Sequence, residues 1–252
     1  QTQIKKYAAV ISIFLAAVIV GLFVFFFCIK RSVEQRSKNT MRNNVVRQSE
    51  HLRTILDIQY DYLNGLAEEI GKTDHLLAKK NMNLIKSITK HTDFGGTALI
   101  KPNGDAHYDN GLIKNLSHRR YFKEVISGKR TLSDPLDSSI SGSTRVVLGV
   151  PIYNSKHKVI GALGGSYDVT ALSRMLFEDL FNGQGCSMII AQNGEIIAFE
   201  GDTSYWNLDY RDNFYKYCCK WIIKDKVTVK KIKQDFKEGK ENLVTADSKK
   251  EG

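Results

Sequence analysis

The sequence predicts an α+β protein with a membrane-spanning helix, a long stalk helix and two tandem modules built on antiparallel sheets, the second of them incomplete. Three observations predict this class. An uncharged apolar run occupies residues 7–29, an amphipathic pattern without Pro or Gly follows as far as Asn64, and strand-like segments with Asn-Gly turns begin at Thr97. With 42% hydrophobic and 25% charged residues, the composition excludes a disordered chain and leaves room for one large or two small globular units.

The apolar run at 7–29 has Ser12 as its one plainly polar side chain, and residues 1–6 form a short N-terminal remnant before it. A helix needs about 20 apolar residues to span a bilayer, which this segment provides. It is longer than the roughly 7–15 residues of a signal-peptide core, and no Ala-x-Ala-like cleavage site follows. We therefore expect an uncleaved membrane anchor.

The 252-residue chain has a formal net charge of +10, and basic residues gather directly after the anchor. Taken alone, this excess predicts a cytoplasmic globular part by the positive-inside rule. The basic segment 30–53 also fits contact with the anionic head groups of a lipid bilayer. The residues next to the anchor are Lys5 and Lys6 on its N-terminal side and Lys30, Arg31, Arg36, Lys38, Arg42 and Arg47 on its C-terminal side.

Residues 30–93 are expected to form the long stalk helix and a helical return over 74–90. Apolar residues recur along the stalk at the spacing of one helix face, at Val45, Leu52, Leu56, Leu63, Leu66 and Ile70. Two interpretations stay open. The stripe pairs with its twin in a parallel homodimer, or it packs on the protein's own sheet.

The first module is predicted over 94–183. It begins with a hairpin whose turn, Asn103-Gly104, is expected to supply two residues with positive φ. A helix capped by Gly128 follows, and then two long strands over 144–153 and 158–167, with a turn between them. A Leu-rich helix over 169–181 is expected to close the module.

The second module, 184–252, repeats this pattern in part. Strands over 187–192 and 195–199 flank a second turn, Asn193-Gly194, and a Lys-rich helix over 225–237 ends before Gly239. These echoes suggest an internal duplication. After Gly239 only the short segment 241–245 and a polar tail follow, and nothing corresponds to the two long strands of the first module. A sheet without them leaves backbone groups unpaired, so we expect a longer natural chain or a damaged gene product.

Motifs for catalysis, cofactors and metals are missing from the sequence. No phosphate-binding Gly-rich loop is present, and the 6 His and 4 Cys lack the spacing of metal ligands. We expect a protein that is not an enzyme and has no cofactor. A membrane-tethered hydrolase whose catalytic residues lie far apart in the sequence remains the alternative. Because no aromatic residues alternate with the basic ones, nucleic acid is not expected as a partner.

Three segments carry a resemblance to a known family: 118–128, which reads HRRYFKEVISG, the strand containing Val150-Pro-Ile-Tyr, and 159–168, which reads VIGALGGSYD. They resemble the double Cache sensor domain of bacterial transmembrane receptors, over residues from about 32 to 244. The resemblance implies an extracytoplasmic sensor with PAS-like modules, membrane-distal at 94–183 and membrane-proximal at 184–252. It also implies a second span and an output module: a diguanylate cyclase (cyclic di-GMP) or a two-component histidine kinase first, a chemotaxis receptor next. This conflicts with the charge count, and we follow the resemblance because large domains are translocated largely regardless of charge.

The resemblance also implies a ligand-binding site. Arg119, Tyr121 and Phe122 match the Arg-x-aromatic-aromatic motif that binds the ligand carboxylate in amino-acid-binding members, where Arg offers two parallel charge-assisted hydrogen bonds. The acidic residue that binds the ammonium corresponds to Ser166, and Asp168 lies two residues further, on the same strand face. We expect a non-catalytic sensor of an anionic or amino-acid-like small molecule, or, if the chain is a remnant, a membrane-anchored protein that does not signal.

Overall fold

The computed structural model describes residues 2–73, 75–137, 144–169, 171, 173, 186–201, 213–217 and 226–240. The chain divides into two compact units, Gln1–Glu50 and His51–Gly252. The first unit contains the N-terminal part of helix α1, Thr2–Gly71. The second unit contains the end of α1 and all other helices and strands of the described part of the chain.

Helix α1 is the long helix expected from the sequence, and it includes the apolar segment 7–29. Among the described residues it is the one helix that is long and apolar enough to cross a membrane, with a mean hydropathy of 2.9 in its most apolar window. The side chains of that window are not buried within the protein. The apolar run therefore has the exposure that a lipid-facing helix requires.

The apolar stripe of α1 packs on the protein's own sheet in the second unit. Leu63 and Ile70 are fully buried in a core that they share with strand residues, and Leu52, Leu56 and Leu66 lie partly buried against it. Further towards the N-terminus, Val45 remains 65% exposed. The second of the two open interpretations thus holds for the stripe from Leu52 onward.

Helix α2, Lys79–His91, begins later than the predicted residue 74. The side-chain amide of Asn81 explains the difference, because it donates hydrogen bonds to Thr73 Oγ1 at 2.8 Å, to the His75 carbonyl at 3.2 Å and to the Leu76 carbonyl at 3.1 Å. These bonds hold the chain after α1 in a turn, so the helix starts only after it. Asp74 itself lies outside the described residues.

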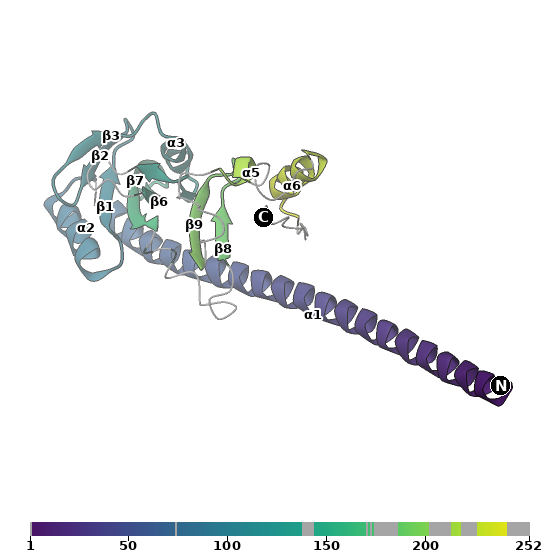
Figure 1. Ribbon diagram of the computed structural model, residues 1–252. Helices are drawn as coiled ribbons and strands as arrows, with labels where there is room; N and C mark the ends of the chain where they lie inside the picture. The colour runs from purple at the N-terminus through teal and green to yellow at the C-terminus, as the bar shows by residue number, and fades with distance from the viewer. Residues whose placement is uncertain are drawn as a thin grey trace. The chain divides into compact units, whose positions relative to one another are not determined.

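The main sheet has seven antiparallel strands in the order β3-β2-β1-β7-β6-β4, with β5 also paired to β6 (Figure 1). Its strands are β1 Gly96–Ile100, β2 Asp105–Tyr108, β3 Ile113–Asn115, β4 Thr131–Leu132, β5 Leu136–Asp137, β6 Thr144–Tyr153 and β7 Val159–Asp168. The short strands β3, β4 and β5 were not expected from the sequence. The mixed helix and sheet content confirms the predicted α+β class.

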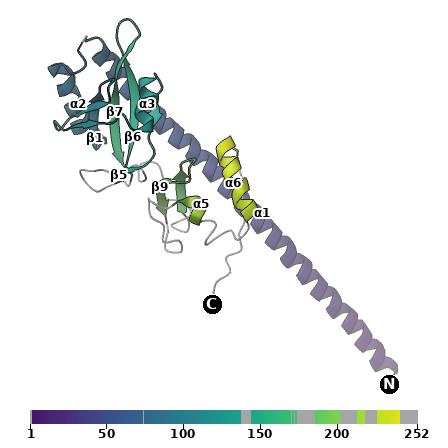
Figure 2. The ribbon, with the colours of Figure 1, turned by 90° about the horizontal axis from the view of Figure 1, so that it is seen from above.

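Strands β6 and β7 form the long central hairpin, as predicted (Figure 2). Val147 pairs with Ser166 and Gly149 pairs with Gly164. The turn after β6 is organised by Asn154 Oδ1, which accepts hydrogen bonds from the backbone N–H groups of residues 156 and 158 at 3.1 and 2.9 Å. Such Asx-type bonding is a strong local signal, which is why this hairpin was predictable.

The two faces of the sheet are covered by different helices. One face packs against α1 and α2 through a core that includes Leu99, Leu148 and Leu163. The other face packs against helix α3, Arg120–Ile126, through a smaller core that includes Ala98 and Ala162 (Figure 1). Because side chains alternate along a strand, Ser166 and Asp168 lie on the α3 face.

The two Asn-Gly turns differ from the prediction in one respect. Gly104 and Gly194 have φ of 93° and 91°, but among the described residues His157 is the one non-Gly residue with positive φ. Asn103 therefore does not have the expected positive φ. The Gly104 N–H donates to the Lys101 carbonyl at 2.9 Å, so the turn is an ordinary one closed by a left-handed Gly. Pro102 favours this form because it fixes φ near −65° at its second position.

The second module is described in part. Strands β8, Cys186–Ile190, and β9, Ile196–Gly201, form a two-stranded antiparallel sheet. Two helices follow, α5, Phe214–Tyr217, and α6, Lys226–Glu238, and Gly239 caps α6 with φ of 64° as predicted. The segment 241–245 and most of the helix expected at 169–181 lie outside the described residues.

Candidate ligand-binding site

A pocket of about 270 Å³ lies on the α3 side of the main sheet. Its walls come from two segments, the start of α3 and the connection from β4 to β5. The lining residues are His118, Arg119, Arg120, Tyr121 and Glu124 on the first wall and Leu132, Ser133, Asp134 and Leu136 on the second. Two of the predicted site residues, Arg119 and Tyr121, thus lie together in one cavity.

The first wall is fixed by the packing of a short helix. Arg119 is the N-cap of α3, with extended backbone angles, and its N–H donates to the Leu116 carbonyl at 2.9 Å. Tyr121, Phe122 and Val125 are buried against the sheet, which holds the helix in place. The predicted residue Phe122 is therefore part of this core.

The second wall is held by a buried serine. Ser133 is 3% exposed, and its Oγ accepts a hydrogen bond from the Val147 N–H at 2.8 Å and donates one to the Asp134 carbonyl at 2.8 Å. The Ser133 N–H donates back to the Val147 carbonyl at 2.9 Å. These bonds extend the pairing of β4 with β6 and set the backbone of Asp134 at the pocket.

Some charged side chains of the pocket form ion pairs within the protein, and others do not. Arg120 is 79% exposed and its Nε donates to Glu124 Oε1 at 3.0 Å, so this pair satisfies itself at the surface. Arg119 is half-buried, and its guanidinium makes no hydrogen bond or ion pair with any described residue. The Asp134 carboxylate likewise forms no ion pair within the described part of the chain. The charge of Asp134 does act on Arg120, whose pKa it helps to raise after the larger effect of Glu124. Arg119 and Asp134 are thus a cation and an anion of the pocket that form no ion pair with each other or with another described residue.

Two tyrosines accompany Arg119. Burial raises the pKa of Tyr121 above its usual range and also raises the pKa of Tyr108, while the positive charge of Arg119 acts in the opposite direction on both. Their phenols therefore stay neutral at physiological pH and keep their O–H donors. An arginine with neutral hydroxyl donors nearby is suited to bind a carboxylate.

The other two predicted site residues lie on β7, outside the lining of this pocket. Ser166 Oγ donates to the Gly96 carbonyl at 3.1 Å and accepts a bond from Arg145 Nη1 at 3.4 Å. Asp168 stands opposite Arg145 in the register of β6 and β7. Both share the α3 face of the sheet with the pocket. Ser166 is bonded to residues of neighbouring strands, and Asp168 Oδ1 accepts a hydrogen bond from the Ala171 N–H at 3.4 Å.

Ser133 and Asp134 are pocket residues that the sequence did not reveal. They lie between two strands of two residues each, which are too short to show a pattern of alternation. Tyr108, whose pKa is affected by the charge of Arg119, does not itself line the pocket. The one local signal is the Asp-Pro dipeptide at Asp134, which is typical of a turn.

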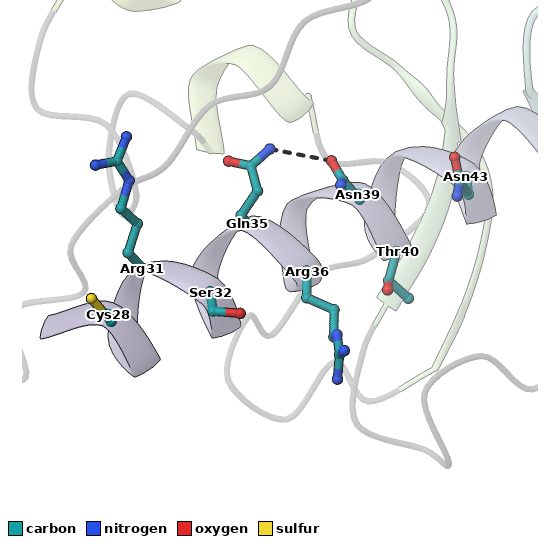
Figure 3. A pocket seen from close by; sticks show the side chains of 8 residues that line it. All are labelled: Cys28, Arg31, Ser32, Gln35, Arg36, Asn39, Thr40 and Asn43. Atoms are coloured by element: carbon teal, nitrogen blue, oxygen red, sulfur yellow. Dashed lines mark hydrogen bonds between the residues drawn. The ribbon is translucent and has the colours of Figure 1, made fainter. Parts of the chain in front are cut away.

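A second hollow, of about 550 Å³, runs along α1 and is lined by residues of that helix alone. Figure 3 shows that its side chains diverge, with Arg31 and Gln35 on one side of the helix and Arg36 on the other. Gln35 Nε2 donates to Asn39 Oδ1 at 3.4 Å, a bond within one helix face. Side chains that diverge from one helix do not converge on a ligand. Among the described residues there is also no cluster of His, Cys, Asp and Glu that is suited to a metal ion.

Comparison with known proteins identifies the fold. No family model matches the sequence, and no curated protein matches it. Among solved structures, the chain is similar to the ligand-binding domain of the Campylobacter jejuni chemoreceptor Tlp3 in complex with L-valine, with 14% identity and a TM-score of 0.51 over 69% of this chain and 76% of that one.

Two further structures have the same TM-score of 0.51. The sensor domain of the V. cholerae histidine kinase DctB is 15% identical over 64% of this chain and 66% of that one. The ligand-binding domain of the Pseudomonas aeruginosa chemoreceptor PctB in complex with L-Arg is 14% identical over 61% of this chain and 66% of that one. The likeness shows that the chain has the fold of these receptor sensor domains, which agrees with the resemblance found in the sequence.

Proposed function

We propose that the chain is the ligand-sensing part of a membrane receptor and that it binds an amino acid in the pocket between α3 and the β4–β5 connection. The observation that carries this proposal is the half-buried Arg119, whose guanidinium lines the pocket without a partner among the described residues. A buried cation without a counter-ion is costly, and a ligand carboxylate relieves that cost.

The ligand class follows from the two free charges. The planar guanidinium of Arg119 matches a carboxylate, and the carboxylate of Asp134, on the opposite wall, matches an ammonium group. Asp134 thus offers the acidic partner that the family motif lacks at Ser166. The fold supports this reading, because two of the similar receptor domains are complexes with L-valine and L-Arg.

A thermal-shift titration of the full chain in detergent tests the proposal, with the standard L-amino acids and, for each, the matching acid without its amino group. We expect at least one amino acid to raise the unfolding midpoint. Arg119→Gln is expected to lower the affinity for that amino acid by at least about tenfold, since the substitution removes a charge-assisted contact to a buried group. Asp134→Asn is expected to lower the affinity for the amino acid but not the affinity for the matching acid without its amino group.

Lys123→Gln is the matched control, because Lys123 carries the same charge on the same helix, is exposed and does not line the pocket. We expect it to leave the affinity within about twofold. Equal losses in the Arg119 and Lys123 variants would mean that only the net charge of the region matters. If no amino acid shifts the midpoint, the assignment of the ligand class is wrong.

Three further features belong to this proposal. The sensor lies outside the cytoplasmic membrane with α1 as its anchor, and its output module is a diguanylate cyclase, a histidine kinase or a chemotaxis receptor. The chain forms a homodimer through the exposed apolar residues of α1 around Val45, which cross-linking in membranes tests. The similar structures are sensor domains and not enzymes, and no feature of the described residues favours the alternative hydrolase.

A further inference from the structure

The connection between α3 and β4 joins the two walls of the pocket. It consists of residues 127–130, between the end of α3 at Ile126 and the start of β4 at Thr131. Gly128, with φ of 93°, turns the chain sharply, and its N–H donates to the Val125 carbonyl at 3.0 Å. A molecule that draws the two walls together therefore acts on both ends of this short segment.

The last residue of the connection, Arg130, contacts α1. Its Nη2 lies 3.0 Å from Asp57 Oδ1, and its guanidinium stands 4.9 Å from the centre of the Tyr60 ring. Tyr60 is 6% exposed and belongs to the core that α1 shares with the sheet. Arg130 thus contacts α1 through an ion pair with Asp57 and through a cation–π contact with the buried Tyr60.

The contact between Arg130 and α1 lies at the edge of the sheet, where the chain passes from one face to the other. Helix α3 and helix α1 cover opposite faces of the sheet, so the sheet separates them. Strand β4 is the last in the strand order, and Arg130 directly precedes it. At this edge the chain passes from the pocket to α1 without crossing the paired strands β6 and β7, whose backbone bonds resist deformation.

We propose that Arg130 couples the pocket to α1, so that movement of the β4–β5 wall changes the packing of α1 around Asp57 and Tyr60. Arg130 is a positioning residue: it touches no ligand and acts through the segment it ends. The ion pair is partly exposed, with 56% of the Arg130 side chain and 42% of the Asp57 side chain accessible. Such a contact is weak enough to be made and broken in a switch.

A double-mutant cycle in the full chain, read by hydrogen exchange in detergent, tests this coupling without any ligand. Coupling is reciprocal, so Asp57→Asn in α1 must change exchange at the distant pocket wall, residues 131–136. We expect Asp57→Asn and Arg130→Gln each to raise exchange there by about two- to fivefold, and the double variant to exceed neither. Lys129→Gln, an exposed neighbour with the same charge change, is expected to have no effect.

Either of two results would overturn the proposal: unchanged exchange at 131–136 in Asp57→Asn, or additive effects in the double variant. Arg130→Lys, which keeps the charge, is expected to retain part of the coupling. If Lys129→Gln matched Arg130→Gln, the effect would come from net charge and the proposal would fail.

A second arm uses an equimolar mixture of the standard L-amino acids and rests on the proposed function. In the unaltered chain we expect the mixture to change exchange both at 118–124 and at residues 51–64 of α1. In Arg130→Gln we expect the mixture still to change exchange at 118–124 but no longer at residues 51–64. If the mixture changes neither region of the unaltered chain, the proposed ligand class fails, while the ligand-free cycle still decides the coupling.

Discussion

Two adjacent glycines of β7 differ in the space that each has for a side chain, because they face opposite sides of the sheet. A Cβ added at Gly165 would lie 2.5 Å from Phe94 Cε1 and 2.6 Å from its Cδ1, inside the buried aromatic pair of Phe94 and Tyr167. A Cβ at Gly164 would have its nearest contact at 3.5 Å, with Val147. Gly165 is therefore required for packing towards α1, and Gly164 leaves room on the side of α3.

This contrast predicts that the same substitution destabilises the protein at one position and not at the other. Gly165→Ala is expected to destabilise the protein by about 1–3 kcal/mol, because the buried ring of Phe94 has no space to move. In a chain of this size each kcal/mol lowers the thermal midpoint by about 2–4 °C. Gly164→Ala is the matched control and is expected to leave the midpoint almost unchanged. Thermal unfolding of the full chain in detergent measures both, and equal midpoints would contradict the packing argument.

At the same scale, the sequence predicted part of the candidate site. Arg119 and Tyr121 were found because an arginine and aromatic residues at fixed spacing form a recognisable motif, and the structure brings both to one pocket. Asp134 was not found, because its position depends on the pairing of Ser133 with Val147, a contact between residues far apart in the sequence. Long-range contacts of this kind leave no local pattern.

At the scale of elements, the junction of α1 and α2 is held by one carboxylate. Glu69 Oε1 lies 2.7 Å from Lys80 Nζ in α2, and its Oε2 lies 2.9 Å from Lys72 Nζ. These hydrogen bonds, first that from Lys80 and then that from Lys72, lower the pKa of Glu69 from 4.5 to about 2. Because the folded-state pKa is lowered, the pair stabilises the protein above pH 4.5, and this contribution is lost as the pH falls towards about 2.

Glu69→Gln is therefore expected to lower the unfolding midpoint slightly at neutral pH and to reduce its fall between pH 4.5 and about 2. The effect is modest because the Glu69 side chain is 41% exposed and solvent screens the pair. Glu68→Gln, at the exposed neighbouring position, serves as the control. A midpoint that falls with pH equally in both variants would show that Glu69 does not connect the two helices measurably.

Elements with a strong local pattern were predicted well. The hairpin of β6 and β7 was predicted nearly to its ends, because a run of apolar and small residues extends along each ten-residue strand and the turn at Asn154 is marked by polar residues. The start of α2 was missed because Asn81 bonds to a turn that only the folded chain creates. The two-residue strands β4 and β5 exist through their pairing with β6 and have no signal of their own.

At the scale of the whole molecule, two physical arguments oppose each other over the side of the membrane on which the sheet lies. The basic residues that follow the apolar segment of α1 favour the cytoplasm. The resemblance of the sequence to double Cache sensors implies the opposite side. The charge rule applies to short loops, whereas the second unit, His51–Gly252, is a domain of the size that is translocated largely regardless of flanking charge. Flanking charge therefore does not decide the side, and the prediction follows the resemblance to double Cache sensors.

We predict that alkaline phosphatase fused after Gly252 of the full chain is active in a bacterial host, because this enzyme needs disulfides that form only outside the cytoplasm. Green fluorescent protein at the same position is expected to stay dark, whereas the same reporter fused before Gln1 is expected to fluoresce. The N-terminal fusion is the control, since it lies on the other side of the anchor. A bright C-terminal fusion with inactive phosphatase would place the domain in the cytoplasm. The pocket between α3 and the β4–β5 connection would then sample cytoplasmic metabolites, and an extracytoplasmic sensor would be ruled out.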